Sequence, residues 1–184
     1  MKVVFFCGGV GKRMSPLSED KFLLKFLGKT LLEYQIEQAR RASLNEFILI
    51  GNPQNIDKIK AVTSNISEAN FAFVVQEKPL GMANALETAQ DVLLDEPVIV
   101  VNPNDVFEST AYTDIVEEYR RAPTATYILA CEVKEYFPGG YLVVNEGGEV
   151  KTIIEKPGRG NEPSDLVNVV IHLHTQPRKF LEYI

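Results

Sequence analysis

The sequence predicts an α/β protein in which a mostly parallel β-sheet carries helices on both faces. Short apolar runs, each about as long as one strand, alternate along the chain with amphipathic segments of helical length. The runs contain almost no polar residues, which is typical of strands buried on both faces. Alternating strands and helices indicate βαβ units with right-handed crossovers, so the predicted fold is Rossmann-like.

The first half of the chain supplies three such strands and their helices. KVVFF at 2–6 is a buried strand, and a glycine-containing loop follows it. TLLEYQIEQARRA at 30–42 is predicted to be a helix, because Thr30 and Glu33 stand at capping-box spacing ahead of an apolar face. The remaining elements of this half are a strand at 46–51, a polar helix near 54–63, a strand at 71–76 and a helix at 81–94.

The second half begins in the same way and then changes. A strand at 97–102, a helix at 113–122 and a strand at 124–133 continue the alternation. Residues 140–157 contain two strand-like runs around Glu-Gly-Gly, which indicates a β-hairpin. A strand at 167–174 and a helix at 177–184 complete the chain. That helix has no closing glycine or polar cap, so we expect residues 1–184 to be a single domain that lacks its C-terminal part.

Composition narrows the function classes. The chain has 184 residues, is 45% hydrophobic and carries a formal net charge of −6, with a pI near 5.1. An acidic chain argues against nucleic-acid binding. The basic residues that do occur together suggest a pocket for an anion; they are Lys12, Arg13, Lys21, Lys25 and Lys29. No apolar segment is long enough to cross a membrane, and we expect a cytoplasmic protein.

The cysteines and histidines give weaker signals. Cys7 and Cys131 lie in apolar runs and are interpreted as small core residues in a reducing compartment, because two cysteines form neither a disulfide framework nor a zinc motif. His172 and His174 alternate along one strand and so share a face, which we expect to be half exposed.

The stretch FFCGGVGKRMSPLSEDK at 5–21 is the first candidate for chemistry. Three glycines, Gly8, Gly9 and Gly11, follow a buried strand and precede Lys12 and Arg13. The stretch fits neither the dinucleotide fingerprint nor the P-loop. Glycines let backbone N–H groups approach phosphate oxygens, and nearby cations add charge-assisted hydrogen bonds. A tight turn with solvated charges is the alternative.

Two further strand ends carry polar residues. In VVNPNDVFE at 100–108, Asp105 follows an apolar strand and could bind Mg²⁺; an Asx turn or helix cap is the alternative. In IIEKP at 153–157, Glu155 could accept hydrogen bonds from hydroxyl groups, and Lys156 could contact a phosphate. A solvated surface pair is the alternative there.

In this order, the stretches resemble the sugar-1-phosphate nucleotidylyltransferases over residues 3 to about 174. The family pattern G-G-x-G-[TS]-R-[LM]-x-P-L-[TS] appears as G-G-V-G-K-R-M-S-P-L-S at 8–18, and the family's lysine falls on Lys21. Its Q-x-x-x-L-G-x-A segment matches Gln76, Leu80, Gly81 and Ala83, and its G-D falls on Asn104-Asp105. The family's sugar-side patterns Y-G-V-V, E-K-P and V-N-x-G correspond to the stretches around Gly140, Glu155-Lys156-Pro157 and Val167-Asn168.

The resemblance implies a Mg²⁺-dependent enzyme that joins an NTP and a sugar 1-phosphate into an NDP-sugar and pyrophosphate. Arg13 and Lys21 would act on the phosphates as catalytic groups, with Gly8, Gly9, Gly11 and Lys12 cradling them. Gln76 and Gly81 would face a thymine, uracil or guanine base, and Asp105 would hold Mg²⁺. The implied sugar-phosphate residues are Gly140, Glu155, Lys156 and Asn168.

The chain also departs from the family pattern. Val170 stands where the family has a glycine, and the family's second metal-binding residue lies beyond residue 184. Two alternatives therefore stay open: transfer to a non-sugar acceptor such as molybdopterin or an alcohol phosphate, and a non-catalytic nucleotide-binding regulatory protein. The expected partners are dTTP, UTP or GTP and a sugar 1-phosphate, with no nucleic acid and no membrane, and a homo-oligomer is compatible with the sequence.

Overall fold

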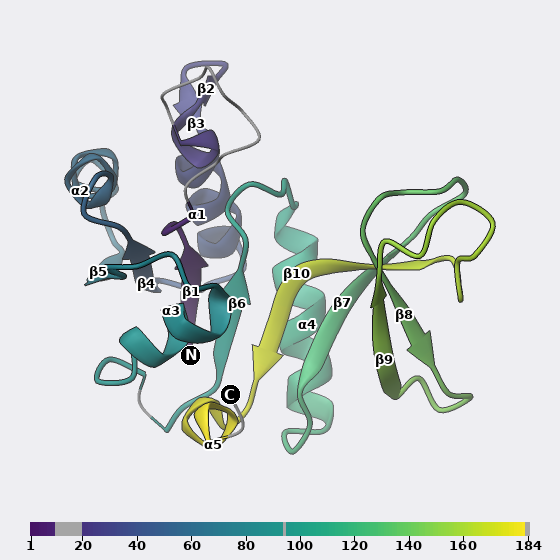
Figure 1. Ribbon diagram of the computed structural model, residues 1–184. Helices are drawn as coiled ribbons and strands as arrows, with labels where there is room; N and C mark the ends of the chain where they lie inside the picture. The colour runs from purple at the N-terminus through teal and green to yellow at the C-terminus, as the bar shows by residue number, and fades with distance from the viewer. Residues whose placement is uncertain (10–19, 94, 183–184) are drawn as a thin grey trace. The chain divides into compact units, whose positions relative to one another are not determined.

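The structure is a computed structural model that describes residues 1–9, 20–93 and 95–182 (Figure 1). The chain divides into two compact units. The first comprises Met1–Tyr127 and His172–Ile184, and the second comprises Ile128–Ile171. Strand β10, Leu166–His174, runs from the second unit into the first.

The first unit contains parallel strands in the order β5-β4-β1-β6, and all three pairings between them are parallel. Their bounds are Lys2–Phe6 for β1, Glu46–Gly51 for β4, Asn70–Val75 for β5 and Val98–Val101 for β6. Val3, Val4 and Phe5 of the central strand are fully buried. The continuous apolar runs of the sequence are therefore strands covered on both faces, as predicted.

Helices cover this sheet on both faces. The side chains of Val4, Ile48 and Val100 point to one face and pack with α3 (Met82–Thr88) and α5 (Pro177–Leu181). Figure 1 shows α1 (Leu31–Arg41) and α4 (Ser109–Arg121) behind the sheet and α3 and α5 in front of it. Helix α2, Ile56–Thr63, contacts β4 and β5. The predicted mostly parallel α/β fold is confirmed.

Helix α1 begins at the predicted capping box. The Thr30 hydroxyl accepts a hydrogen bond from the Glu33 backbone N–H at 3.1 Å, and Glu33 Oε2 accepts one from the Thr30 backbone N–H at 2.8 Å. Two of the N–H groups that a helix start leaves without partners are thereby satisfied, which is worth about 1 kcal/mol for such a cap.

Short elements that the sequence did not predict lie between the glycine loop and α1. A 3₁₀ helix, η2, spans Lys21–Leu23, and a two-stranded ladder joins β2 (Lys25–Phe26) to β3 (Lys29–Thr30). Leu27 and Gly28 form the turn with positive φ angles of 50° and 86°. Such a turn suits the right-handed twist of a hairpin.

Helix α3 is shorter than the predicted 81–94. It ends at Thr88, and the next backbone N–H, that of Ala89, donates to the carbonyl groups of Ala85, Leu86 and Glu87. Residues 89–92 continue as turns, and Leu93 directly after them is still fully buried. The apolar spacing was thus correct, but the last part of the segment packs as turns.

The second unit contains β7 (Tyr127–Glu132), β8 (Gly140–Val144) and β9 (Val150–Glu155), together with the first part of β10. Strand β8 pairs antiparallel with both β9 and β10, and β7 pairs with β10. The turn between β8 and β9 is closed by Asn145, whose Oδ1 accepts hydrogen bonds from the backbone N–H groups of Gly147 and Glu149. The predicted hairpin around Glu-Gly-Gly is confirmed.

Two predictions of burial differ from the structure: Cys131 was expected in the core, and the face of His172 and His174 was expected to be half exposed, which holds for His172 alone. Cys131 is exposed, because its strand β7 has one partner strand among those described and is exposed at its last two residues. Cys7 is buried as predicted. On β10, His174 is only 8% exposed and packs against Phe180 of α5 with ring centroids 4.5 Å apart, so this face is more covered than expected.

Candidate functional site

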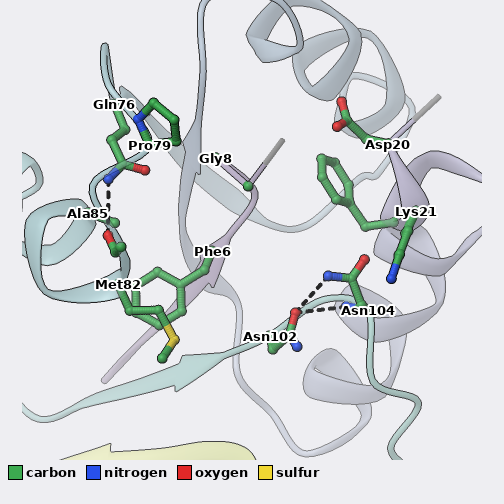
Figure 2. Close-up of a pocket in the computed structure, with 13 residues that line it drawn as sticks. Phe6, Gly8, Asp20, Lys21, Gln76, Pro79, Met82, Ala85, Asn102 and Asn104 are labelled. Carbon is green, nitrogen blue, oxygen red and sulfur yellow. Dashed lines mark hydrogen bonds between the residues drawn. The ribbon is translucent and has the colours of Figure 1, made fainter. Parts of the chain in front are cut away.

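A pocket of about 570 Å³ opens at the carboxyl ends of β1, β5 and β6 in the first unit (Figure 2). Ligands of open α/β sheets bind at this edge. The described residues that line the pocket come from the segments following those three strands, from η2 and from the start of α3. They include Phe6, Gly8, Gly9, Asp20, Lys21, Gln76, Pro79, Gly81, Met82, Asn102 and Asn104.

Gly8 and Gly9 begin the loop after β1. Gly8 is buried, and a Cβ atom on it would lie 2.6 Å from Oε1 of Gln76, so any side chain there would displace Gln76. Gly9 is exposed, with open space where a Cβ would be. Gly11, Lys12 and Arg13 lie outside the described residues, and their assignments stay predictions.

Two buried asparagines that the sequence interpretation missed hold the ends of this loop. Asn55 Nδ2 donates to the Cys7 carbonyl at 2.8 Å and to Asp20 Oδ2 at 3.0 Å. Asn52 Nδ2 donates to the Gly8 carbonyl at 3.2 Å, and its backbone N–H donates to Asn55 Oδ1 at 2.8 Å. Asn-Pro-Gln-Asn follows β4 directly, and polar residues after a buried strand were the signal that could have identified them.

Lys21 is the described cation of the pocket wall. It begins η2, in which Phe22 and Leu23 are buried and fix the position of the segment. The charge of Lys21 acts on Asp105 and opposes the rise of that carboxyl's pKa. Lys21 and Asp105 were predicted from distant motifs, and the structure brings them into one electrostatic environment.

Gln76 and Gly81 lie on the other side of the pocket. Gln76 is 4% exposed, and its Nε2 donates to the Gly81 carbonyl at 3.1 Å (Figure 2). The same nitrogen donates to Asn84 Oδ1 at 2.9 Å. Gly81 has φ of 101° and precedes α3, a backbone conformation that favours glycine. Both residues predicted to face a base are therefore neighbours at the pocket.

The segment after β6 carries the predicted metal residue. Asn102 Nδ2 donates to Asp105 Oδ2 at 3.1 Å, while Asn102 Oδ1 accepts from the backbone N–H and the Nδ2 of Asn104. The Asx-type turn considered for Asp105 is thus made by Asn102. Burial raises the pKa of the Asp105 carboxyl, and the hydrogen bond from Asn102 and the charge of Lys21 oppose that rise.

The main chain at Asp105 is anchored from α1 and α4. Gln35 is fully buried and donates from Nε2 to the Asp105 carbonyl at 2.6 Å. Its Oε1 accepts a hydrogen bond from the hydroxyl of Tyr112 at 2.8 Å. Neither residue stood out in the sequence, because both occupy ordinary core positions of amphipathic helices.

The second unit gathers the four residues predicted for a sugar phosphate. Gly140 pairs with Glu155 across the β8–β9 ladder, and a Cβ on Gly140 would lie 3.1 Å from Glu155 Oε2 and 3.9 Å from Cβ of Asn168. Lys156 has a φ of 48°, its backbone N–H donates to the Gly139 carbonyl at 3.0 Å, and its Nζ lies 3.4 Å from Glu155 Oε1. Both charged side chains are exposed, so the ion pair itself contributes little stability.

Other groups of potential ligands are sparse in the part of the chain that the structure describes. No set of three or more histidine, cysteine, aspartate or glutamate residues there could hold a metal ion. Burial lowers the pKa of His172, to about 4, and also that of His174, so both rings are neutral near pH 7. None of the described helices is long and apolar enough to cross a membrane.

Comparisons with known proteins agree with this geometry. Among curated proteins, mannose-1-phosphate guanylyltransferase 1 of Arabidopsis thaliana is 30% identical over 166 residues, covering 85% of this chain and 45% of the relative. Glucose-1-phosphate thymidylyltransferase of Streptomyces griseus is 28% identical over 178 residues, covering 94% and 49%. The chain therefore spans about half the length of the curated relatives it matches.

Among solved structures, UDP-glucose pyrophosphorylase in complex with UDP-glucose superposes with a TM-score of 0.79 at 19% identity, covering 98% of this chain and 77% of the other. That likeness bears on the fold. The sequence model of the nucleotidyl transferase family matches residues 2–176, which include the glycine loop, the pocket at the strand ends and the β8–β9 hairpin. With nearly its whole length matched, the chain belongs to the nucleotidyl transferase family.

Proposed function

We propose that this chain provides the catalytic domain of a sugar-1-phosphate nucleotidylyltransferase, which converts an NTP and a sugar 1-phosphate into an NDP-sugar and pyrophosphate. The observation that carries the proposal is the pocket of the first unit. It brings together Gly8, Lys21, Gln76 and Gly81, which come from motifs far apart in the sequence. Family membership and the named activities of the relatives support the same reaction class.

In this reaction an oxygen of the sugar 1-phosphate attacks the α-phosphorus of the NTP. The new P–O bond forms as the bond from the α-phosphorus to the bridging oxygen breaks, and pyrophosphate leaves with that electron pair. No covalent enzyme intermediate is needed, so catalysis rests on positioning and on neutralising charge. Lys21 and Arg13 would supply that charge, and losing either would cost on the order of 3 kcal/mol by analogy with other transition-state donors.

The nucleotide would occupy the first unit. Backbone N–H groups of Gly8 and Gly9, with Gly11 and Lys12 from the loop, would cradle the phosphates. Gln76 and Gly81 would contact the base, and their side-chain and backbone groups suit thymine, uracil or guanine. dTTP, UTP and GTP are therefore the proposed donors.

The sugar 1-phosphate would be bound by the second unit. The missing side chain of Gly140 leaves room beside Glu155 and Asn168, both of which can form hydrogen bonds with sugar hydroxyls. Lys156 would contact the phosphate as a point charge. The carboxylate and the amide would favour a polyhydroxylated acceptor.

Mg²⁺ is the implied metal, and Asp105 fits it. Mg²⁺ is commonly held by one or two carboxylates together with substrate phosphates and water. Asp105 offers one half-buried carboxylate at the edge of the sheet, and its raised pKa reflects a desolvated charge that a cation would stabilise. When bound, the metal would neutralise the charge of the triphosphate.

Nucleotide binding can be tested first by thermal unfolding with dTTP, UTP, GTP, CTP and ATP, with and without Mg²⁺. A ligand at 100 times its Kd should stabilise by about 2.7 kcal/mol, which raises Tm by several degrees. The stabilisation should be lost in Lys21→Ala and kept in Lys60→Ala, since Lys60 is an exposed lysine of α2 outside the pocket. No shift with any NTP would contradict the proposed nucleotide site.

Turnover is tested by pyrophosphate release with the bound NTP and a panel of sugar 1-phosphates. Release with a sugar 1-phosphate supports the proposal. Release only with a non-sugar phosphate acceptor would replace the proposed acceptor, and NTP binding without release from any acceptor would contradict catalysis by this chain.

A further inference from the structure

The carboxamide of Gln76 is held in one orientation. Its nitrogen, Nε2, donates to the Gly81 carbonyl at 3.1 Å and to Asn84 Oδ1 at 2.9 Å. An amide nitrogen carries two hydrogens, so both are used in these two bonds. Because Gln76 is 4% exposed, losing a partner for either hydrogen would be costly.

Asn84 is oriented in turn. It lies in the first turn of α3, and its Nδ2 donates to Glu87 Oε2 at 3.4 Å, which directs Oδ1 toward Gln76. The Gly81 carbonyl can only accept. Turning the Gln76 amide over would place its oxygen against two acceptors, the Gly81 carbonyl and Asn84 Oδ1. The hydrogen bonds from Asn84 to Glu87 and from Gln76 to Asn84 therefore fix which end of the Gln76 amide faces the cavity.

The end of the Gln76 amide that is left to face the cavity is the oxygen, Oε1. Oε1 lies beside Gly8, where a Cβ would approach it to 2.6 Å, and Gln76 lines the cavity. Figure 2 shows the amide oxygen of Gln76 on the side of Gly8 and the amide nitrogen turned away toward α3. A nucleotide base at this wall would meet a hydrogen-bond acceptor.

We propose that Asn84 is a positioning residue that makes the pocket select lactam bases, and this inference rests on the proposed function. Uracil and thymine present N3–H, and guanine presents N1–H, to an acceptor on the protein. Cytosine N3 and adenine N1 carry lone pairs at the same ring position and are repelled by Oε1. The substrate class is thus an NTP whose base carries a ring N–H between carbonyl or amino groups.

The test is calorimetric titration of the chain, in the presence of Mg²⁺, with nucleotides compared two at a time, the two bases having the same ring size. UTP is compared with CTP, and GTP with ATP, so that ring size cancels within each pair. If the pocket admits bases of a given ring size, the lactam nucleotide of that pair should bind about 100-fold more tightly than the other nucleotide. The reason is that the buried Gln76 oxygen meets an N–H donor in the lactam base and a lone pair in the other base. Inorganic tripolyphosphate serves as the base-free probe.

Asn84→Ala should lower the lactam preference about tenfold, because one Gln76 hydrogen loses its acceptor and the amide can rotate. Asn84→Asp retains an acceptor oxygen for Gln76 but loses the hydrogen bond to Glu87 Oε2, so it should restore part of the preference. Thr88→Ala is the matched control on α3, since the Thr88 hydroxyl bonds the main-chain carbonyl of Asn84 and not the side-chain oxygen that accepts from Gln76. Tripolyphosphate affinity should be equal in all variants, which separates base selection from damage to the phosphate loop.

The outcomes separate the proposed nucleotide site from the proposed role of Asn84. If NTPs bind but neither pair shows a lactam preference, this inference is wrong and the proposed nucleotide site stands. If the preference exists and Asn84→Ala keeps it in full, the role of Asn84 is wrong. If no NTP binds, both the proposed function and this inference fail.

Discussion

Neutral carboxamides build most of the framework around the pocket. Asn52 and Asn55 hold the start of the glycine loop, Gln35 holds the backbone at Asp105, and Asn102 bonds the Asp105 side chain. An amide can donate and accept while buried without the desolvation cost of a charge. The framework is thus neutral, and the charge of Lys21 stays available for a ligand.

Asp105→Asn should stabilise the protein and impair its use of Mg²⁺. Burial raises the pKa of Asp105, so between its ordinary pKa and the raised one the folded state binds more protons than the unfolded state, and stability falls as pH rises. Asparagine mimics the protonated form, so at pH 7.5 without metal the Tm of the variant should be higher. The gain in NTP affinity from Mg²⁺ should drop at least about tenfold.

Thermal unfolding at pH 7.5 and at pH 4 checks the predicted change in stability. NTP titration with and without Mg²⁺ checks the predicted loss of Mg²⁺ dependence. At pH 4 the wild type and the variant should differ less in Tm, since a larger fraction of the wild-type carboxyl is protonated there than at pH 7.5. Full Mg²⁺ dependence in the variant would show that Asp105 does not hold the metal.

The Asn55 amide makes a second residue-level prediction. Asn55→Ala removes both donors to Cys7 and Asp20 and should cost about 2 kcal/mol in unfolding free energy. Asn55→Asp is nearly isosteric but sets a carboxylate against the Cys7 carbonyl and the Asp20 carboxylate, so it should be worse than alanine at pH 7. Lowering the pH should shrink that difference, because protonation removes the repulsion.

Urea unfolding of the two variants at pH 7 and pH 5 provides the measurement. Gln54→Ala is the control, because Gln54 is exposed and bonds Asn52 only through its backbone; it should change stability by less than about 0.5 kcal/mol. An Asn55→Asp variant as stable as Asn55→Ala at pH 7 would rule out a strained carboxylate at this position.

Single residues could be selected from the sequence where a family motif or a strand end marked them, as for Gly8, Lys21, Gln76 and Asp105, whose binding roles stay predictions. Gln35 was not predictable, because its partner, the Asp105 carbonyl, lies 70 positions away in the sequence. A side chain that bonds the backbone of a distant segment leaves no local pattern. Such residues appear only once the fold has brought the segments together.

Among the elements, those with a strong local signal were predicted closely. The buried strands β1 and β4 have the predicted bounds because their apolar runs are sharply limited by polar or glycine residues. The C-terminal end of α3 was not predicted, since Leu93 is buried after turns at 89–92 as it would be in a continuing helix. Nor did the apolar run of β7 reveal that the strand has a single partner strand among those described, which exposes Cys131.

The two histidines of strand β10 lead us to predict that the protein loses stability at acidic pH. Burial lowers the pKa of His172 to about 4 and also lowers that of His174, and the Nδ1 atom of His174 has no hydrogen-bond partner among the described residues. Below the unfolded pKa of about 6.5 the unfolded chain binds more protons than the folded one. Stability should therefore fall from about pH 6.5 toward pH 4, by up to about 1.4 kcal/mol per pH unit for each histidine.

Unfolding of the wild type and of His174→Phe from pH 7.5 to pH 4.5 measures this effect. Phenylalanine keeps a ring against Phe180, so the packing is largely preserved while the titrating group is lost. The stability of the variant should fall less steeply below pH 6.5. Parallel curves for the two proteins would mean that His174 does not contribute to the acid sensitivity.

At the scale of the whole molecule, two features matter: where the basic residues lie in the sequence, and how the predicted binding residues are distributed between the two units. The chain carries a net charge of −6, and three of its 19 lysine and arginine residues lie close together in the sequence at the glycine loop, namely Lys12, Arg13 and Lys21. A local cationic site in an acidic protein favours a specific anion over general polyanion binding. The predicted nucleotide residues all belong to the first unit and the predicted sugar residues to the second.

This division predicts separate footprints in hydrogen–deuterium exchange. An NTP with Mg²⁺ should slow exchange in the first unit, around Gly8–Gly9, Lys21–Leu23 and Gln76–Ala85, whereas a sugar 1-phosphate should slow it in β8, β9 and the first part of β10. Every residue of β9 is exposed, so its baseline exchange should be fast and the protection easy to measure. With either ligand present at 100 times its Kd, amide hydrogen exchange that requires global unfolding should slow about 100-fold.

Gly140→Ala separates the two footprints. The added Cβ would lie 3.1 Å from Glu155 Oε2 and 2.9 Å from Ile153 Cγ2, so the Glu155 carboxylate must move away from the sugar site. Protection of the hairpin by the sugar 1-phosphate should be lost in this variant, while protection of the first unit by the NTP persists, and inorganic phosphate serves as the control for the sugar. If the sugar 1-phosphate protected the first unit and left β8 and β9 unchanged, Gly140, Glu155, Lys156 and Asn168 would not form its binding site.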